Sequence, residues 1–185
     1  MNIQHKGTIT IETLRLVLRR FEEKDAKDMY ENWAGDLQVC KYLSWGPHSN
    51  EEVSRKRILS WISNYIRFNS YVWVLEYKRS GVAVGSISVE IADDKARMCE
   101  VGYCLGKEYW NQGLMTEALL AVMHYLFYEV GYQTIQAKHD VLNIASGRVM
   151  QKAGMTYSKT ELKVGVRRDA TYYDCDVYIR NIYDD

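Results

Sequence analysis

The chain has 185 residues, which is enough for one globular domain with a core of its own. It is 47% hydrophobic, and 24 basic residues balance 24 acidic ones, so zero net charge argues against a general nucleic-acid binder. No run approaches the roughly 18 apolar residues of a membrane helix, and the N-terminus lacks a signal-peptide core. We therefore expect a cytoplasmic protein without a membrane or nucleic-acid partner.

The first half of the sequence predicts one strand, two helices and then three strands. Apolar and basic residues alternate over 14–20, which predicts a strand, and helical spacing over 22–35 predicts a helix that ends at Gly35. A second helix, capped by Ser49 or Asn50, is predicted to run to about Arg67. Strands are predicted over 71–77, 82–91 and 98–106, the first two joined as a hairpin.

The second half predicts a long amphipathic helix over 114–130, ended by Gly131, followed by a strand over 134–141 and a short helix over 144–154. Two strands, 155–164 and 171–179, end the chain, and the last could offer an edge for pairing between copies, which leaves a homo-oligomer open. The order β-α-α-β-β-β-α-β-α-β-β predicts an α/β protein with a mixed sheet, because three consecutive strands do not fit a doubly wound fold.

The cysteines and histidines do not indicate a metal site. The four cysteines form no CxxC pair, and the four histidines form no HExxH motif. We expect four reduced thiols and no metal ion.

A polar turn directly before the long helix is the strongest candidate binding feature. Asn111, Gln112 and Gly113 precede a helix whose free N–H groups and positive dipole end would attract a phosphate. Gly113 would let the backbone approach the ligand closely. The sequence matches neither a P-loop nor a GxGxxG motif, and a plain strand-to-helix turn is the alternative.

Two segments around this turn carry a family resemblance. EVGYCLGKEYWNQGLMTEAL, followed by HDVLNIASGRVMQKAGM, resembles the GNAT superfamily of acetyl-CoA-dependent N-acetyltransferases, and more narrowly its RimJ/RimL-type branch of ribosomal-protein N-terminal acetyltransferases. ETLRLVLRRFEEKDA resembles that branch's first strand and helix, and YLSWGPHS its substrate-side loop. The likeness covers about residues 12–180 and implies a single domain with the GNAT fold.

The resemblance implies acetyl-CoA as cosubstrate. Backbone groups of the strand before the turn would pair with the pantetheine arm, and the phosphate motif Q/R-x-x-G-x-G/A falls on the turn, departing at its first and last positions. Asn143 would hold a pantetheine amide, although an asparagine there also suits a helix N-cap. The implied cofactor-binding residues are Tyr103, Cys104, Leu105, Trp110, Asn111, Gln112, Gly113, Leu114, Met115 and Asn143.

The resemblance also implies catalytic residues. Glu100 matches a strand glutamate that acts as a base, often through water; the alternative is a structural carboxylate bonded to a neighbour. Met150 occupies the position of the family's usual proton-donating tyrosine, so Ser146 becomes the candidate that protonates the thiolate. The alternative is that the Ser146 hydroxyl only forms a hydrogen bond with the helix backbone. Trp45 and His48, with Tyr42, belong to the loop that borders the acceptor amine in this family.

These residues predict an N-acetyltransferase that moves an acetyl group from acetyl-CoA to a primary amine by direct attack on the thioester. The amine would belong to a protein N-terminus or to a small molecule such as an antibiotic or a polyamine. A non-catalytic acyl-CoA sensor is the alternative from another class, since Met150 cannot donate a proton, and an interaction domain that binds no CoA is the third.

Overall fold

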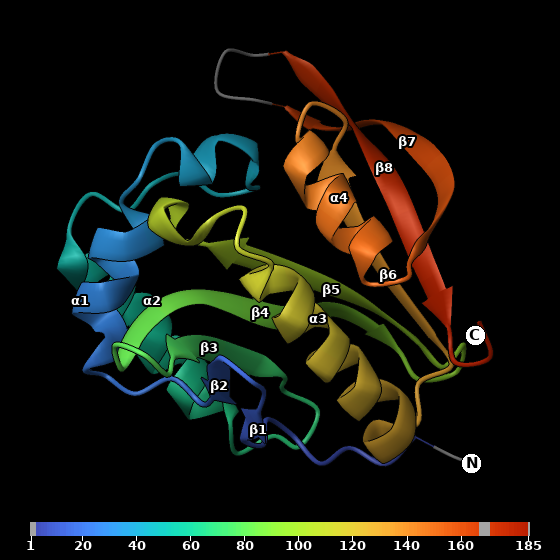
Figure 1. The fold of residues 1–185 in the computed structure, drawn as a ribbon, viewed down its shortest axis with the longest axis horizontal. Coiled ribbons are helices and arrows are strands. Elements are labelled where there is room, and N and C mark those ends of the chain that lie inside the picture. Colours follow the sequence, from blue (N-terminus) through green and yellow to red (C-terminus); the bar gives the residue numbers. More distant parts are fainter. Residues whose placement is uncertain (1–2, 167–170, 185) are drawn as a thin grey trace.

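A computed structural model describes residues 3–166 and 171–184 and contains one mixed eight-stranded sheet (Figure 1). The strand order is β1-β2-β3-β4-β5-β6-β8-β7, and every neighbouring pair is antiparallel except β5 and β6. The predicted α/β class with a mixed sheet is confirmed. The elements are β1 (Ile11–Glu12), β2 (Leu16–Arg19), α1 (Asp25–Met29), α2 (Glu51–Asn64), β3 (Val72–Tyr77), β4 (Val82–Asp93), β5 (Met98–Leu105), α3 (Leu114–His124), β6 (Thr134–Asp140), α4 (Ile144–Lys152), β7 (Thr156–Val166) and β8 (Tyr172–Asn181).

Helices cover both faces of the sheet, and each face has its own core. Helices α3 and α4 lie on one face, where Leu119 and Met150 are buried against Trp73 and Ile135. Helices α1 and α2 cover the other face, where buried Trp33 and Ile58 belong to a second cluster. The alternation of side chains along the strands produces this division, because successive residues of a strand face opposite sides.

Two of the predicted helices, those over 22–35 and 114–130, each end in a wider turn. Residues Tyr30–Ala34 extend α1, and residues Tyr125–Val130 extend α3, in both cases as π-helix. Gly131 follows with φ of 99°, so the predicted glycine stop is observed at the end of this extension. Asn50 caps α2 through a hydrogen bond from the Val53 N–H, which decides between the two predicted caps.

The sheet parts between β5 and β6. The two strands pair in parallel only at three positions, from Met98 with Thr134 to Glu100 with Gln136. Beyond Glu100 they diverge, and the half of the sheet that contains β6, β7 and β8 turns away from the rest (Figure 1). The β6-facing edge of β5 over 103–105 therefore has no strand beside it.

The order of the last two strands differs from our expectation. We predicted that the terminal strand, 171–179, would offer an edge, but β8 lies between β6 and β7 and pairs with both. The edge strand is β7 instead. Long-range pairing of β8 with β6 from Thr134 to Asp140 decides this order, and alternation along the strand does not encode it.

Three short features were not predicted, one of them a turn of 3-10 helix over Lys107–Tyr109. Strand β1 has only two residues, which is too short for a periodic signal, and a turn of 3-10 helix over Val39–Tyr42 lies within the loop between α1 and α2. Among the described residues, no helix is long and apolar enough to cross a membrane.

Candidate active site

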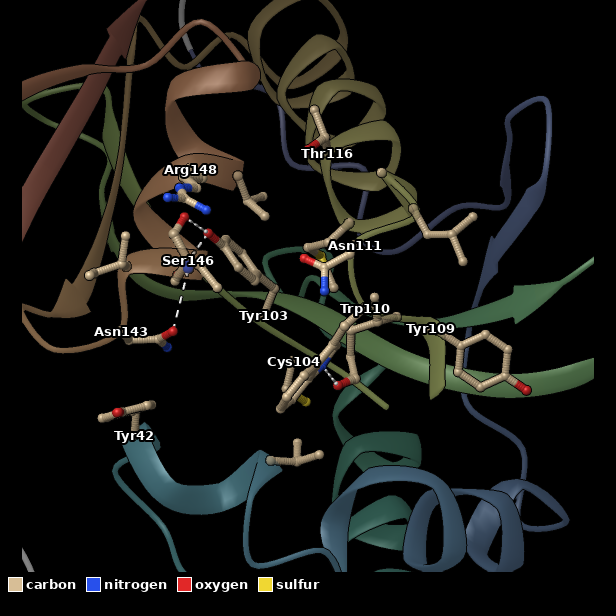
Figure 2. Close-up of a pocket in the computed structure, with 18 of the residues that line it drawn as sticks. Tyr42, Tyr103, Cys104, Tyr109, Trp110, Asn111, Thr116, Asn143, Ser146 and Arg148 are labelled. Atoms are coloured by element: carbon tan, nitrogen blue, oxygen red, sulfur yellow. Dashed lines mark hydrogen bonds between the residues drawn. The ribbon is translucent and has the colours of Figure 1, made fainter. Parts of the chain in front are cut away.

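A cavity of about 500 Å³ opens where β5 and β6 part. Strand β5 supplies Tyr103, Cys104 and Leu105, and the start of α3 and one side of α4 supply two further walls (Figure 2). The loop between α1 and α2 closes the side opposite α4 with Tyr42. The size suits a small-molecule site. Predicted site residues that line it are Tyr103, Cys104, Leu105, Trp110, Asn111, Gly113, Leu114, Met115, Asn143 and Ser146.

The turn before α3 has the backbone of an anion-binding turn. Asn111 and Gly113 both adopt left-handed conformations, with φ of 59° and 76°, and Gly113 is the N-cap of α3. A left-handed residue at a helix start turns successive N–H groups toward one side. The indole N–H of Trp110 donates to the Leu105 carbonyl at 2.7 Å, which fixes the turn to the end of β5.

Gln112 is the one predicted turn residue that does not line the cavity. Its side-chain amide donates to the Glu108 carbonyl at 2.9 Å, and its own carbonyl accepts from Arg15 at 2.8 Å. The side chain therefore braces the turn, and any contribution of Gln112 to a ligand would come from its backbone.

Asn143 and Ser146 begin α4 at the wall of the cavity. The Asn143 side chain accepts from the Ser146 N–H at 3.4 Å, so the predicted N-cap is present, and both residues also line the cavity. The Ser146 hydroxyl lies 3.0 Å from the hydroxyl of Tyr103, which also donates to the Ser146 carbonyl at 3.1 Å (Figure 2). Burial raises the pKa of Tyr103, so its phenol stays protonated near neutral pH.

Met150 lies in the core of the molecule. Its side chain is 1% exposed and packs in the cluster under α3 and α4, and it is not among the cavity-lining residues. The position that carries a tyrosine in the resembled family therefore supplies no group to the cavity in this chain.

Glu100 lies at the point where the two strands part, and it does not line the cavity. Its side chain is 7% exposed, and both of its oxygens have partners on β6. One oxygen pairs with the Lys138 ammonium at 3.0 Å, and the other accepts from the Gln136 amide at 2.7 Å. The carboxylate thus links β5 to β6 beside the last residue pair that the two strands share.

Trp45 and His48 lie next to each other in the loop between α1 and α2, but neither lines the cavity. Their ring centroids are 5.4 Å apart, and the Nδ1 atom of His48 is 2.8 Å from the Ser54 hydroxyl. Burial, with a smaller contribution from the charge of Arg57, lowers the pKa of His48. From this loop the structure brings Gln38, Val39, Tyr42 and Leu43 to the cavity instead.

Sequence reasoning missed the two cations of the cavity. Arg148 and Lys152 are four residues apart in α4, so they share one helix face, and both line the cavity. Their spacing shows from sequence that they share a helix face, but whether that face turns toward the cavity depends on how α4 packs against the sheet. Among the described residues, the lining contains these two basic side chains and no carboxylate, and no group of three potential ligands is placed to hold a metal ion.

Comparison with known proteins identifies the class that this fold and cavity define. The family model of the acetyltransferase (GNAT) domain matches residues 15–156. The uncharacterized N-acetyltransferase YoaA of Bacillus subtilis is 27% identical over 173 residues, which are 94% of either chain. The chain belongs to the GNAT acetyltransferase family, as the sequence motifs predicted, and is an enzyme of the acyltransferase class.

Solved structures share the same architecture. A GNAT-family acetyltransferase from Bacillus anthracis has a TM-score of 0.81 and 25% identity, covering 94% of this chain and 98% of its own. RimL, a ribosomal L7/L12 alpha-N-protein acetyltransferase solved with coenzyme A, has a TM-score of 0.81, 20% identity and coverages of 96% and 100%. The microcin C7 self-immunity acetyltransferase MccE, solved with acetyl-CoA and AMP, has a TM-score of 0.80, 20% identity and coverages of 92% and 94%.

Proposed function

We propose that this protein transfers the acetyl group of acetyl-CoA to a primary amine by direct attack of the amine on the thioester. One observation carries the proposal: the free edge of β5 and the turn at the start of α3 open on the same cavity. The edge suits the amide-bearing pantetheine arm, and the turn suits the pyrophosphate, so one extended ligand would occupy both. RimL and MccE, which share the fold, were solved with coenzyme A and acetyl-CoA, and this supports acetyl-CoA as the cosubstrate.

The chemistry requires three groups around the thioester. The amine nitrogen attacks the carbonyl carbon, the carbon–sulfur bond breaks, and the CoA thiolate leaves. A backbone N–H on the free edge of β5 would stabilise the developing oxyanion. The amine loses a proton to a base, and the thiolate gains one from an acid.

Ser146 is our candidate for the acid. Its hydroxyl lines the cavity at the start of α4 and shares a hydrogen bond with Tyr103, so the hydroxyl is held in place by a partner on β5. A serine hydroxyl is a weak acid, and for this reason we expect a moderate contribution.

Glu100 remains a predicted base acting through water, and its alternative role is that of a structural carboxylate that links β5 to β6. Its low exposure, its two partners on β6 and its absence from the cavity lining support the structural role. Substitution of Glu100 separates the two roles, as described in the Discussion.

The acceptor amine would enter from the side of the loop between α1 and α2. This wall is formed by Gln38, Val39, Tyr42 and Leu43 and contains no carboxylate among the described lining residues. A polyamine or an aminoglycoside carries several positive charges that a site would have to balance. The lining therefore favours an acceptor with a single amine, such as a protein N-terminus. A small-molecule amine of low charge is the second candidate.

The test is release of CoA from acetyl-CoA with a panel of amines. Peptides with free N-termini, amino-acid derivatives, polyamines and aminoglycosides would be compared with the same peptides carrying blocked N-termini. We expect release with unblocked peptides that is reduced in Ser146→Ala. Binding of acetyl-CoA without release from any amine would instead support the sensor alternative, and no binding at all would refute a CoA-dependent function.

A further inference from the structure

Arg15 lies in the turn between β1 and β2, nearly one hundred positions from the phosphate-binding turn in sequence, yet it contacts that turn directly. Its Nη1 donates to the Gln112 carbonyl at 2.8 Å. Its Nη2 lies beside Gly113, where a Cβ added to the glycine would be 3.6 Å away. Gly113 lines the cavity, whereas Arg15 is not among the lining residues, so the guanidinium supports the turn from behind.

This contact fixes the orientation of one peptide plane. The carbonyl of Gln112 and the N–H of Gly113 belong to the same planar trans peptide, so they point in opposite directions. Because Arg15 holds the carbonyl, the Gly113 N–H points away from Arg15, and Gly113 itself lines the cavity. A glycine in a left-handed conformation offers little resistance to rotation of this plane, and a rotated plane would present an oxygen to a phosphate.

Glu117 in turn holds Arg15. One carboxylate oxygen accepts from the Arg15 Nε at 2.7 Å, and the other accepts from the Arg15 backbone N–H at 2.8 Å and from the Thr13 hydroxyl at 2.6 Å. The Glu117 side chain is 17% exposed and Arg15 is 37% exposed. Since Glu117 belongs to the first turn of α3, the guanidinium is anchored to the same helix whose N-terminus it supports.

We propose that Arg15 is a positioning residue for acyl-CoA: held by Glu117, it locks the Gln112–Gly113 peptide so that the Gly113 N–H faces the phosphates of the ligand. This inference rests on the proposed function and adds a determinant of affinity from the N-terminal segment. It assigns Arg15 no contact with the thioester, so its effect should be confined to ligands that carry the pyrophosphate.

The experiment measures the affinities of two ligands for the folded full-length protein. Acetyl-CoA and S-acetylpantetheine share the thioester and the pantetheine arm, but only acetyl-CoA has the phosphates. The variants are Arg15→Met and, as a matched control, Arg97→Met. Arg97 also donates to a backbone carbonyl, that of the left-handed Gly131 itself, but at the opposite end of the long helix. Unfolding temperatures are recorded for each variant.

We expect Arg15→Met to weaken acetyl-CoA binding about tenfold, the size of one charge-assisted hydrogen bond, and to leave S-acetylpantetheine binding unchanged. Arg97→Met should bind both ligands as the wild type does. An equal loss for both ligands, or no loss for acetyl-CoA, would overturn the proposal. If Arg15→Met fails to fold, Glu117→Gln should show the same ligand-selective loss at about threefold. A wild-type protein that binds no acetyl-CoA would refute the proposed function itself.

Discussion

The hydroxyl oxygens of Tyr103 and Ser146 lie 3.0 Å apart, although one residue belongs to β5 and the other to α4. The contact joins β5 to α4 at the cavity wall, beyond the point where β5 stops pairing with β6 (Figure 2). It sets the position of the only hydroxyl that we assign to proton transfer, and it also ties the start of α4 to the strand expected to hold the cosubstrate.

Removal of the Tyr103 hydroxyl should disturb Ser146 while the aromatic ring still lines the cavity. We expect Ser146→Ala to lower kcat about 100-fold, at the low end for a general acid, and Tyr103→Phe to lower it about threefold. Tyr103→Phe should also lower the free energy of unfolding by about 1 kcal/mol. The double variant should be no slower than Ser146→Ala alone, because Tyr103 acts through Ser146. Additive losses in steady-state kinetics would show that the two hydroxyls act independently.

Substitution of Glu100 should affect stability more than catalysis. Glu100→Gln removes the charge that pairs with Lys138, and we expect a loss of about 1–3 kcal/mol in urea unfolding, reduced by the partial exposure of Lys138. The kcat of the folded variant should stay within about threefold of wild type, as should that of Lys138→Met, which breaks the same pair. A fall of kcat by about 100-fold in Glu100→Gln, without a matching fall in Lys138→Met, would establish Glu100 as the base.

Gly113 and Gly81 provide a matched pair for the phosphate-binding turn. Both are left-handed, with φ of 76° and 69°, so alanine should cost about 1 kcal/mol of stability at either position. Gly81 has open space around it, in the hairpin between β3 and β4. We therefore expect Gly113→Ala to weaken acetyl-CoA binding about tenfold and Gly81→Ala to leave it unchanged, measured by calorimetric titration. Equal affinities would mean that the turn does not hold the ligand.

Cys104 lines the cavity, but its thiol should take no part in acetyl transfer. Burial raises its pKa to about 11, so the neutral thiol, which is a poor nucleophile, predominates at every pH below that value. We expect no acetylated Cys104 by mass spectrometry after incubation with acetyl-CoA at pH 8, and turnover by Cys104→Ala within about threefold of wild type. Alkylation by iodoacetamide should become fast only as the pH approaches 11. An acetyl-cysteine adduct would indicate a two-step mechanism in place of direct attack.

Much of the fold was readable from the sequence because local patterns determine most of its elements. Alternation and helical spacing located every strand except the two-residue β1, and also the four helices. Asn50 begins a helix and Gly131 ends one, as their residue types predict. The position of β8 between β6 and β7 was not readable, because strand order depends on pairings between distant segments.

The candidate site divides in the same way. Residues close together in sequence, such as those of the turn before α3, were located by their motif, and the structure brings most of them to the cavity. Contributions that depend on the packing of distant segments were missed. Arg15 reaches the turn from the first strands, and the direction of Arg148 depends on how α4 packs on the sheet. Trp45 and His48 belong to the loop that contributes to the cavity but do not line it, and their contact with the acceptor stays a prediction.

Three residue pairs join β5 to β6, so the sheet consists of two parts that are connected by a narrow strip. Few backbone hydrogen bonds join the two parts at this strip, and Glu100 and the hydroxyl contact of Tyr103 add side-chain links beside it. A ligand bound along the open edge of β5 would extend the connection between the two parts of the sheet. Occupancy should therefore stiffen the whole molecule, and slower amide hydrogen exchange in β6 and β8, remote from the ligand itself, would report it.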